Sequence, residues 1–173
     1  MSEAIKIPFG MAQITVNGED VGLQGDAAVF SATPTYIDVE VYEMGVYDKA
    51  LEKWEVMLTV RFAQEDYSKF KMAMPHLEEL TDVEGNVTGL TDGKLMQRAR
   101  DKAVEVVVHP IEAGDSKEFD VTVFKAFPVG TFERTYGKEA SVYEVEFMAL
   151  PRTGNINQHG NYFRIGEEVA PVI

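Results

Sequence analysis

The stretch WEVMLTVRFAQEDYSKFKMAMP, residues 54–75, changes its hydrophobic period part-way along. Over residues 54–62 apolar side chains occupy every second position, which is typical of a half-buried β-strand. Apolar residues then recur at spacings of three and four, which indicates an amphipathic helix, with Glu65 and Asp66 in the first turn where the helix dipole favours acidic groups. The sequence therefore predicts a strand that continues directly into a short helix. Four side chains of that helix are expected to pack on the sheet: Tyr67, Phe70, Met74 and Leu77.

Most of the remaining sequence also predicts strands. Residues 11–25 predict two strands joined at Asn17 and Gly18, because both residues tolerate the positive φ angles of a tight hairpin turn. Pro34 is expected to interrupt the next strand, and residues 44–52 are expected to form a wide hairpin loop. Three further strands are predicted over residues 103–110, 118–128 and 140–151. The expected fold class is mainly β, a β-sandwich or barrel-like subunit with one flanking α-helix and a long loop.

Two segments lack the pattern of a strand or a helix. Residues 80–102 contain three glycines and no sustained alternation, so we expect a long loop, and loops of this length are commonly functional. Residues 152–173 are rich in glycine and then apolar, which predicts a C-terminal arm. With these segments included, length and composition predict a single domain over residues 1–173.

The chain is acidic and contains no cysteine. Its 16 basic and 29 acidic residues give a formal net charge of −13. Because duplex binding depends on Lys and Arg side chains that neutralise phosphates, such a chain is expected to repel nucleic acid. The lack of cysteine excludes disulfides, thiolate zinc sites and cysteine nucleophiles, and it is compatible with a reducing compartment. No apolar run approaches the length of a membrane span, so we expect a soluble protein in a cytoplasm.

The sequence contains no recognisable catalytic, cofactor-binding or metal-binding motif. The three histidines, His76, His109 and His159, are far apart and lack metal-ligand spacing. Residues 82–93 resemble a calcium loop only superficially, because Val87 stands where the sharp-turn glycine belongs. Phosphate-cradling glycine motifs and the serine nucleophile elbow are also absent. We therefore predict no enzymatic activity and no cofactor, and a structural or interaction role instead.

Apolar residues outside the predicted core mark candidate contacts between subunits. Residues 44–52 are more apolar than a solvent-exposed loop usually is, and the long loop and the C-terminal arm also carry large apolar side chains. Eight residues in these three segments are candidate inter-subunit contacts: Met44, Val46, Tyr47, Leu51, Leu95, Met96, Tyr162 and Phe163.

Three stretches together carry a family resemblance. VNGEDVGLQGDAAVFSATPTYIDVEV, residues 16–41, is a hairpin followed by strand sequence, and LTVRFAQEDYSKFKMAMP, residues 58–75, is a strand that runs into a helix ending at Met-Pro. YEVEFMALP, residues 143–151, is a terminal strand that closes in Phe-x-Ala-Leu-Pro. Over residues 14–151 this arrangement resembles the tail tube proteins, or major tail proteins, of tailed bacteriophages and prophages.

The resemblance implies a structural virion protein that acts in the phage tail and is made in the host cytoplasm during assembly. In that family, subunits close into hexameric rings, and the rings stack into a hollow tube through which the genome leaves the capsid. The implied partners are other copies of the chain, a tape measure protein, and tail initiator and distal tail proteins, with DNA passing unbound and no membrane contact. Part of the charge is then expected to line an acidic channel. Alternation does not decide which of four carboxylates face it: Asp38, Glu40, Glu52 and Glu55.

Other functions also fit the sequence. Within the structural class, the chain could be the tube protein of a contractile injection or secretion system, or a tail terminator that forms one ring instead of a stack. From a different class, it could be a small-ligand-binding β-barrel or a carbohydrate-active β-protein. The latter would have a concave pocket lined by aromatic side chains and a few carboxylates.

Overall fold

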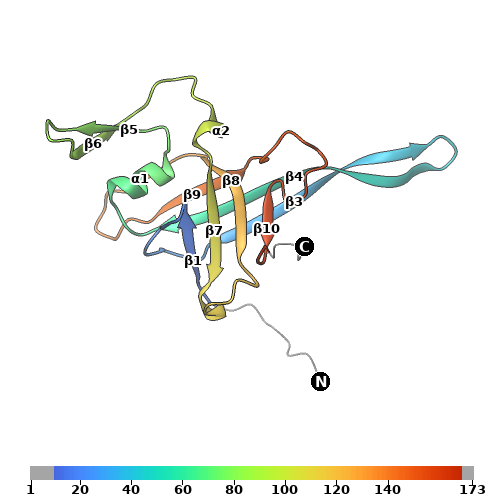
Figure 1. Ribbon diagram of the computed structural model, residues 1–173, viewed down its shortest axis with the longest axis horizontal. Helices are drawn as coiled ribbons and strands as arrows, with labels where there is room; N and C mark the ends of the chain where they lie inside the picture. The colour runs from blue at the N-terminus through green and yellow to red at the C-terminus, as the bar shows by residue number, and fades with distance from the viewer. Residues whose placement is uncertain (1–9, 169–173) are drawn as a thin grey trace, which may run out of the picture.

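The computed structural model describes residues 10–168 as a mainly β structure, which confirms the predicted fold class (Figure 1). The strands are β1 (Ala12–Val16), β2 (Glu19–Asp20), β3 (Val29–Val41), β4 (Gly45–Phe62), β5 (Glu78–Thr81), β6 (Val87–Thr91), β7 (Val104–Pro110), β8 (Val121–Val129), β9 (Tyr143–Ala149) and β10 (Phe163–Ile165). The helices are α1 (Tyr67–Ala73) and α2 (Ala99–Lys102), and a 3-10 turn spans Ile111–Ala113.

Strand β8 joins two layers of a large antiparallel sheet. The strand order is β2-β1-β7-β8-β9-β4-β3, and β10 pairs with β8 beside this path. β7 pairs with β8 from residue 121 to residue 126, whereas β10 pairs with residues 121–123 of β8 and β9 pairs with residues 126–129. In Figure 1, β1, β7 and β8 run across β9, β4 and β3. Such a strand, shared by two layers, is typical of sheets that pack across one another around one core.

The alternation predicted at the start of the quoted stretch is present in β4. Val56, Leu58, Val60 and Phe62 are at most 1% exposed, and Trp54 packs partly buried against the same cluster. That cluster takes most of its buried side chains from β1, β4, β7, β8 and β9, and it is completed by Ala73 of α1 and by Val21. Burial of each large side chain of this kind contributes about 1.5–3 kcal/mol.

The first hairpin has the predicted turn. Asn17 and Gly18 join β1 to β2 with φ angles of 52° and 80°. Two successive positive φ angles are required by the tight turn whose twist matches a hairpin, and Asn-Gly is the favoured pair for it.

Helix α1 starts later than predicted. The Asp66 side chain accepts a hydrogen bond from the Lys69 backbone N–H at 2.8 Å and caps the helix at its N-terminus. Asp66 and Glu65 therefore precede the helix instead of lying in its first turn. An N-cap aspartate satisfies one of the backbone N–H groups that a first helical turn leaves unpaired.

The same helix also ends earlier than predicted. Its last residue is Ala73, and the backbone N–H of Met74 donates to the Phe70 carbonyl at 2.8 Å. Pro75 follows, and proline cannot continue a helix because it lacks an N–H and clashes with the preceding turn. Leu77 therefore lies beyond the helix that was predicted to include it.

The expected break at Pro34 is absent. β3 continues through this residue, which pairs with Trp54 of β4. β3 lies at one end of the strand order, and an edge strand accepts proline where the missing N–H would point away from the neighbouring strand.

The expected wide loop at residues 44–52 is also absent. β3 and β4 keep pairing as far as Val41 and Gly45, so the connection is a turn of residues 42–44. Residues 36–53 thus form a long two-stranded projection, here named the ribbon, which extends from one side of the body in Figure 1. The loop prediction failed because the mixed apolar and charged pattern of an exposed hairpin does not resemble a half-buried strand.

The predicted loop at residues 80–102 contains a second hairpin. β5 and β6 pair across a turn in which one Asp82 carboxylate oxygen accepts from the backbone N–H groups of Glu84 and Asn86, each at 2.9 Å. Gly85 takes the positive φ angle of 87° that the turn requires. The segment that resembled a calcium loop is therefore a hairpin turn closed by its own aspartate.

The predicted C-terminal arm folds back on the body over the part that the structure describes. β10 pairs with β8, and Phe163 meets Phe30 and Trp54 edge-on with ring centroids 5.5 Å away in each case. This segment is therefore a strand that closes the core between the crossed layers. The last five residues of the predicted arm, 169–173, lie outside the described residues.

Candidate interaction surfaces

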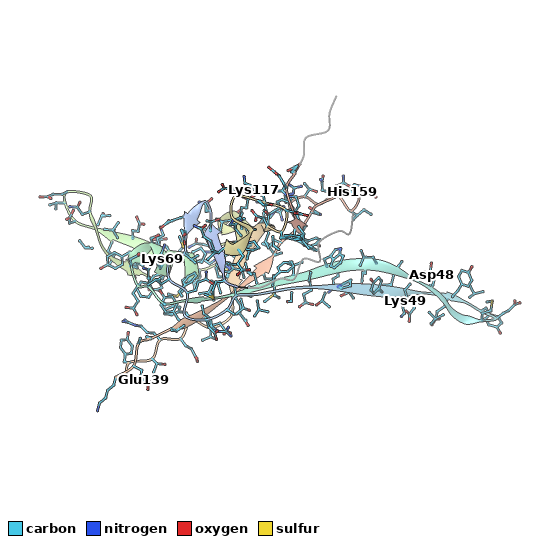
Figure 2. The ribbon with its side chains drawn as sticks, turned by 90° about the horizontal axis from the view of Figure 1, so that it is seen from below. Asp48, Lys49, Lys69, Lys117, Glu139 and His159 are labelled. Atoms are coloured by element: carbon cyan, nitrogen blue, oxygen red, sulfur yellow. The ribbon has the colours of Figure 1, made fainter. Side chains whose placement is uncertain are left out.

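The ribbon exposes a large amount of apolar side chain. Figure 2 shows it extending from the body, with Asp48 and Lys49 toward its far end. Nine large apolar residues in it are each at least 40% exposed. They are Tyr36, Ile37, Val39, Val41, Tyr42, Met44, Val46, Tyr47 and Leu51.

Both faces of the ribbon carry such side chains. Residues paired directly across two antiparallel strands lie on the same face. One face therefore contains the pairs Tyr36 with Leu51, Asp38 with Lys49 and Glu40 with Val46. The opposite face contains Ile37 with Ala50, Val39 with Asp48 and Val41 with Gly45. No side of the ribbon is uniformly polar, as a hairpin that remained in solvent would be expected to be.

The ribbon is also acidic. It contains five carboxylates and two lysines, and Lys49 forms an ion pair with Asp38 across the strands. Of the four carboxylates considered for an acidic channel, Asp38, Glu40 and Glu52 lie on the ribbon, and Glu55 lies exposed on β4 next to it.

The structure separates the eight candidate contact residues into three groups. Met44, Val46, Tyr47 and Leu51 are exposed on the ribbon. Leu95 and Met96 are 88% and 98% exposed in the connection between β6 and α2. Tyr162 and Phe163 instead pack, partly buried, against the core of their own chain, and a role for them in contacts between subunits stays a prediction. The signal missed in the sequence was the aromatic pair in a segment otherwise rich in glycine and polar residues.

The four helix residues lie in different environments. Phe70 stacks on Tyr143 with ring centroids 6.0 Å apart and meets Phe132 edge-on at 5.8 Å. Met74 packs against the core cluster and Leu77 is partly buried. Tyr67 is 46% exposed, and its hydroxyl donates to the Thr88 carbonyl at 2.9 Å, which connects α1 to β6.

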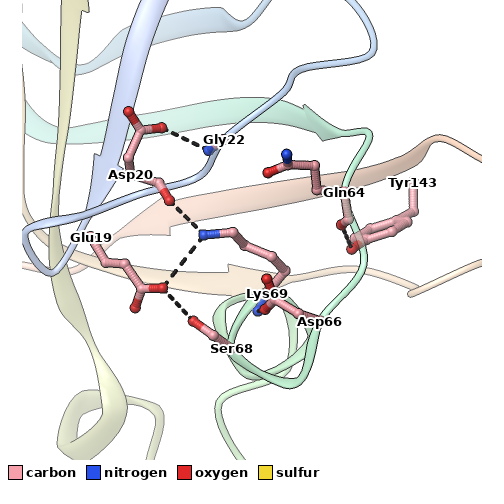
Figure 3. A network of polar contacts seen from close by, with 8 residues as sticks. All are labelled: Glu19, Asp20, Gly22, Gln64, Asp66, Ser68, Lys69 and Tyr143. Carbon is pink, nitrogen blue, oxygen red and sulfur yellow. Dashed lines mark hydrogen bonds and ion pairs between the residues drawn. The ribbon is translucent and has the colours of Figure 1, made fainter.

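Lys69, which the sequence did not single out, is the most buried charged residue of α1 (Figure 3). It is 6% exposed, and its ammonium donates to the Asp20 carbonyl at 2.5 Å and lies 3.5 Å from a Glu19 carboxylate oxygen. That same oxygen accepts from the Ser68 hydroxyl at 2.6 Å. Two consecutive residues of α1 thus fasten the helix to the β1–β2 hairpin.

Burial and hydrogen bonds shift the pKa values of two groups near α1. The pKa of Asp20 is lowered, chiefly because its carboxylate accepts from the Gln13 side chain, then from the Gly22 backbone N–H, with a smaller contribution from Lys69. Burial raises the pKa of Tyr143 to about 12, with the charges of Glu65 and Asp66 adding to the effect. The Tyr143 hydroxyl therefore stays protonated and donates to the Gln64 carbonyl at 2.5 Å.

His109 bridges the turn between β7 and β8. Its two ring nitrogens lie 2.5 Å from an Asp120 carboxylate oxygen and 2.8 Å from the Gly114 carbonyl oxygen. The hydrogen bond to Asp120, followed by that to Gly114, raises the pKa of His109, with smaller contributions from the charges of Asp120 and Asp115. An imidazole whose two nitrogens both face acceptors is stabilised in its doubly protonated form.

A groove of about 570 Å³ lies where the ribbon meets the body. Leu51 and Trp54 form one side, and the loop that includes His159, shown in Figure 2, forms the other. Its volume is within the range of small-ligand sites.

The described residues contain neither a metal cluster nor a membrane-spanning helix. Within residues 10–168, no cluster of three or more His, Asp or Glu side chains could hold a metal ion. None of the helices described in that range is long and apolar enough to cross a membrane.

Comparison with known proteins identifies solved structures that have the same fold. No family model and no curated protein matches the sequence. Among solved structures, the chain is similar to the sheath/tube terminator of the extracellular contractile injection system PVC, with a TM-score of 0.55 and 13% identity over 85% of this chain and 94% of that one. The chain shares the fold of this injection system protein.

Two further structures have the same fold. One belongs to the PVC sheath-tube complex in its extended state, with a TM-score of 0.54 and 14% identity over 83% of this chain and 86% of that one. The other is the tube-terminating cap of the anti-feeding prophage, with a TM-score of 0.52 and 12% identity over 84% of this chain and 91% of that one. Identities this low establish the fold alone.

Proposed function

We propose that this chain is a structural subunit of a phage tail or contractile injection system, where copies of it assemble into rings that stack as a tube. The observation that carries this proposal is the ribbon, with its nine exposed apolar side chains on both faces. A two-stranded hairpin is at best marginally stable in water without a surface to pack on. A second protein surface that covers the ribbon removes this apolar area from solvent.

The open edge of the sheet supports assembly into a ring. β3 has a paired neighbour on one side only, β4, within the described residues. An unpaired edge strand is a template for pairing with another chain, and closure of a ring removes every such edge. Contacts of this kind are heterologous, because an edge on one copy meets a different surface on the next. Six copies per ring are what the sequence resemblance implies.

The acidic charge supports passage of nucleic acid through such a tube. With a net charge of −13, a channel lined by part of these carboxylates repels a polyanion, whereas a basic wall would retain it. In this function the chain performs no catalysis and needs no cofactor. Its further partners would be a tape measure protein within the tube and tail initiator or distal tail proteins at its end.

A second candidate is a terminator or cap that forms a single ring at the end of a tube. It is favoured by the similarity of the chain to a sheath/tube terminator and to a tube-terminating cap. The two candidates differ in whether rings of this chain stack on one another.

Electron microscopy and sedimentation velocity of the purified full-length chain test the proposal. We expect rings or tubes, and their loss in a variant in which residues 37–50 are replaced by Asn-Gly, which joins the paired residues Tyr36 and Leu51 through a two-residue turn. Because the core lies outside the ribbon, this variant is expected to keep the melting temperature of the parent within a few degrees. As a matched control, Val83→Ser alters one fully exposed apolar residue at the tip of the β5–β6 hairpin.

The outcomes separate the candidates. Stacked rings support the tube subunit, and single rings that do not stack support the terminator. A protein that stays monomeric at all concentrations, with and without tail initiator, and binds a sugar or lipid in the groove at the ribbon base would refute both.

A further inference from the structure

A second groove of about 440 Å³ lies at the far end of α1, away from the ribbon. One wall is the segment after Ala73, and the opposite wall is the loop of residues 92–97 between β6 and α2. The apolar part of its lining includes Met74, Pro75, Leu77, Leu95, Met96 and Phe127. Among these, Leu95 and Met96 are 88% and 98% exposed and form an apolar lip.

The loop that bears this lip is held in a fixed conformation. A Cβ atom at Gly93 would lie 2.1 Å from the His76 carbonyl oxygen, so the two backbone segments are in close contact there. The Gln97 amide oxygen lies 3.3 Å from a His76 ring nitrogen, and its amide nitrogen donates to the Lys94 carbonyl at 2.9 Å. Met96 has a φ angle of 66°, which is uncommon for a residue other than glycine. Non-glycine residues in this conformation cluster at functional sites, so the exposed side chains of this loop are candidates for a contact.

A basic segment borders this groove in an otherwise acidic chain, while Lys94 and Asp92 both line the groove itself. Residues 94–102 contain four of the 16 basic residues and one acidic residue, which gives a local charge of +3 against a total of −13. Lys94, Arg98 and Lys102 are exposed, and within residues 10–168 no carboxylate pairs with them. Unpaired surface charges of one sign steer a partner of the opposite sign.

The tip of the ribbon has the complementary properties. Tyr42 is fully exposed and Met44 is 69% exposed, and Glu43 lies between them. The whole ribbon carries a net charge of −3, from five carboxylates and two lysines. An apolar tip with acidic neighbours thus fits an apolar groove that is bordered by a basic segment.

We propose that the ribbon tip of one copy docks in this groove of a second copy, with Tyr42 and Met44 against the Leu95–Met96 lip and Glu43 facing Lys94. This contact rests on the self-assembly proposed above, and it names the two surfaces through which copies of the chain would meet. Within one chain the two surfaces lie apart, so the contact joins different copies (Figure 1). Because tip and groove are different surfaces, each copy uses both, and the contact propagates from copy to copy.

Charge reversal tests this contact. One variant carries Glu40→Lys and Glu43→Lys on the ribbon. The other carries Lys94→Glu in the groove lining and Arg98→Glu in the basic segment beside it. Each variant alone juxtaposes like charges and is expected to raise the concentration needed for assembly at least about tenfold. An equimolar mixture restores assembly, because each reversed surface meets its complement on the other variant. Higher salt weakens assembly of the parent and of the mixture alike.

Cysteine cross-linking tests it independently, since the natural chain has no cysteine. A chain with both Met44→Cys and Met96→Cys is expected to form a ladder of disulfide-linked oligomers, whereas each single variant cannot extend beyond a dimer. The control chain combines Met44→Cys with Val83→Cys, which places the second thiol at the fully exposed tip of the β5–β6 hairpin, and gives no ladder.

The outcomes distinguish the contact from the function on which it rests. Assembly of both reversed variants as readily as the parent, without a ladder, overturns this contact and leaves the proposed self-assembly intact. A parent that never assembles, together with the lack of a ladder, overturns both. Cross-linking of Met96→Cys to another tail protein, instead of to this chain, assigns the groove to a different partner and overturns the contact.

Discussion

The Lys69 ammonium donates to the Asp20 carbonyl at 2.5 Å, and this bond joins residues 49 positions apart in the sequence. It ties α1 to the β1–β2 hairpin at a site that is almost closed to solvent. A buried charged donor is costly unless its hydrogen bonds are made, so its carbonyl and carboxylate acceptors determine where the helix can sit.

Lys69→Met is expected to lower the free energy of unfolding by about 1–3 kcal/mol, because it removes the hydrogen bond that the nearly buried Lys69 ammonium donates to the Asp20 carbonyl. Urea denaturation followed by circular dichroism measures this. Lys71→Met is the matched control, since Lys71 lies two residues further on the same helix in an exposed ion pair with Glu79 at 3.0 Å. Such surface pairs contribute about 0–1 kcal/mol. Equal effects of the two changes would contradict the anchoring role of Lys69.

Phe70→Ala is expected to cost about 2–4 kcal/mol of stability, because it removes the stacked contact with Tyr143 and the edge contact with Phe132. Phe70→Asp places a charge in the same aromatic cluster and is expected to prevent folding or assembly. Thermal unfolding by calorimetry checks the first change, and expression with electron microscopy checks the second. A Phe70→Asp protein that folds and assembles normally would refute the packing role.

The His109–Asp120 pair predicts a pH dependence of stability. The folded state raises the pKa of His109, so the stabilisation is fully present below the unfolded value of 6.5 and is lost as the pH rises through the folded value. The melting-temperature difference between the parent and His109→Gln is therefore expected to be largest near pH 6 and to shrink at higher pH. A difference that stays constant from pH 5.5 to 9 would show that the pair does not titrate.

Gly93→Ala is expected to cost about 1–3 kcal/mol and to expose the loop of residues 92–97 to protease, because its Cβ atom would meet the His76 carbonyl oxygen at 2.1 Å. Gly137→Ala is the control, since a Cβ atom there has no heavy atom within 4 Å. Limited proteolysis with mass spectrometry locates the cleavage. Resistance equal to that of the parent would mean that the loop does not depend on this close approach.

Local signals in the sequence were sufficient to predict the strand β4 and the first hairpin turn. The alternation in β4 predicted that the side chains of Val56, Leu58 and Phe62 lie on one face, and all three are buried. Asn17-Gly18 predicted the first turn. Both depend on neighbours within a few positions, where period and turn chemistry are informative.

Features that depend on distant partners were not predicted. Lys69 is buried where it meets a carbonyl in another hairpin, and Phe163 is partly buried because β10 pairs with β8 beside Phe30 and Trp54. Within the ribbon, only residues 44–52 were predicted as a loop, because this segment packs on nothing in the described part of the chain and lacks the one-sided burial that produces alternation. Its apolar content nevertheless identified Met44, Val46, Tyr47 and Leu51 as contact candidates before the hairpin was known.

Cryo-electron microscopy of the assembled particle tests the central claim most directly, because it resolves what covers the ribbon. The account predicts rings of this chain in which the ribbon is buried against neighbouring copies and the β3 edge is paired. A particle in which the ribbon projects into solvent, or a chain that forms no assembly with its tail partners, would contradict it.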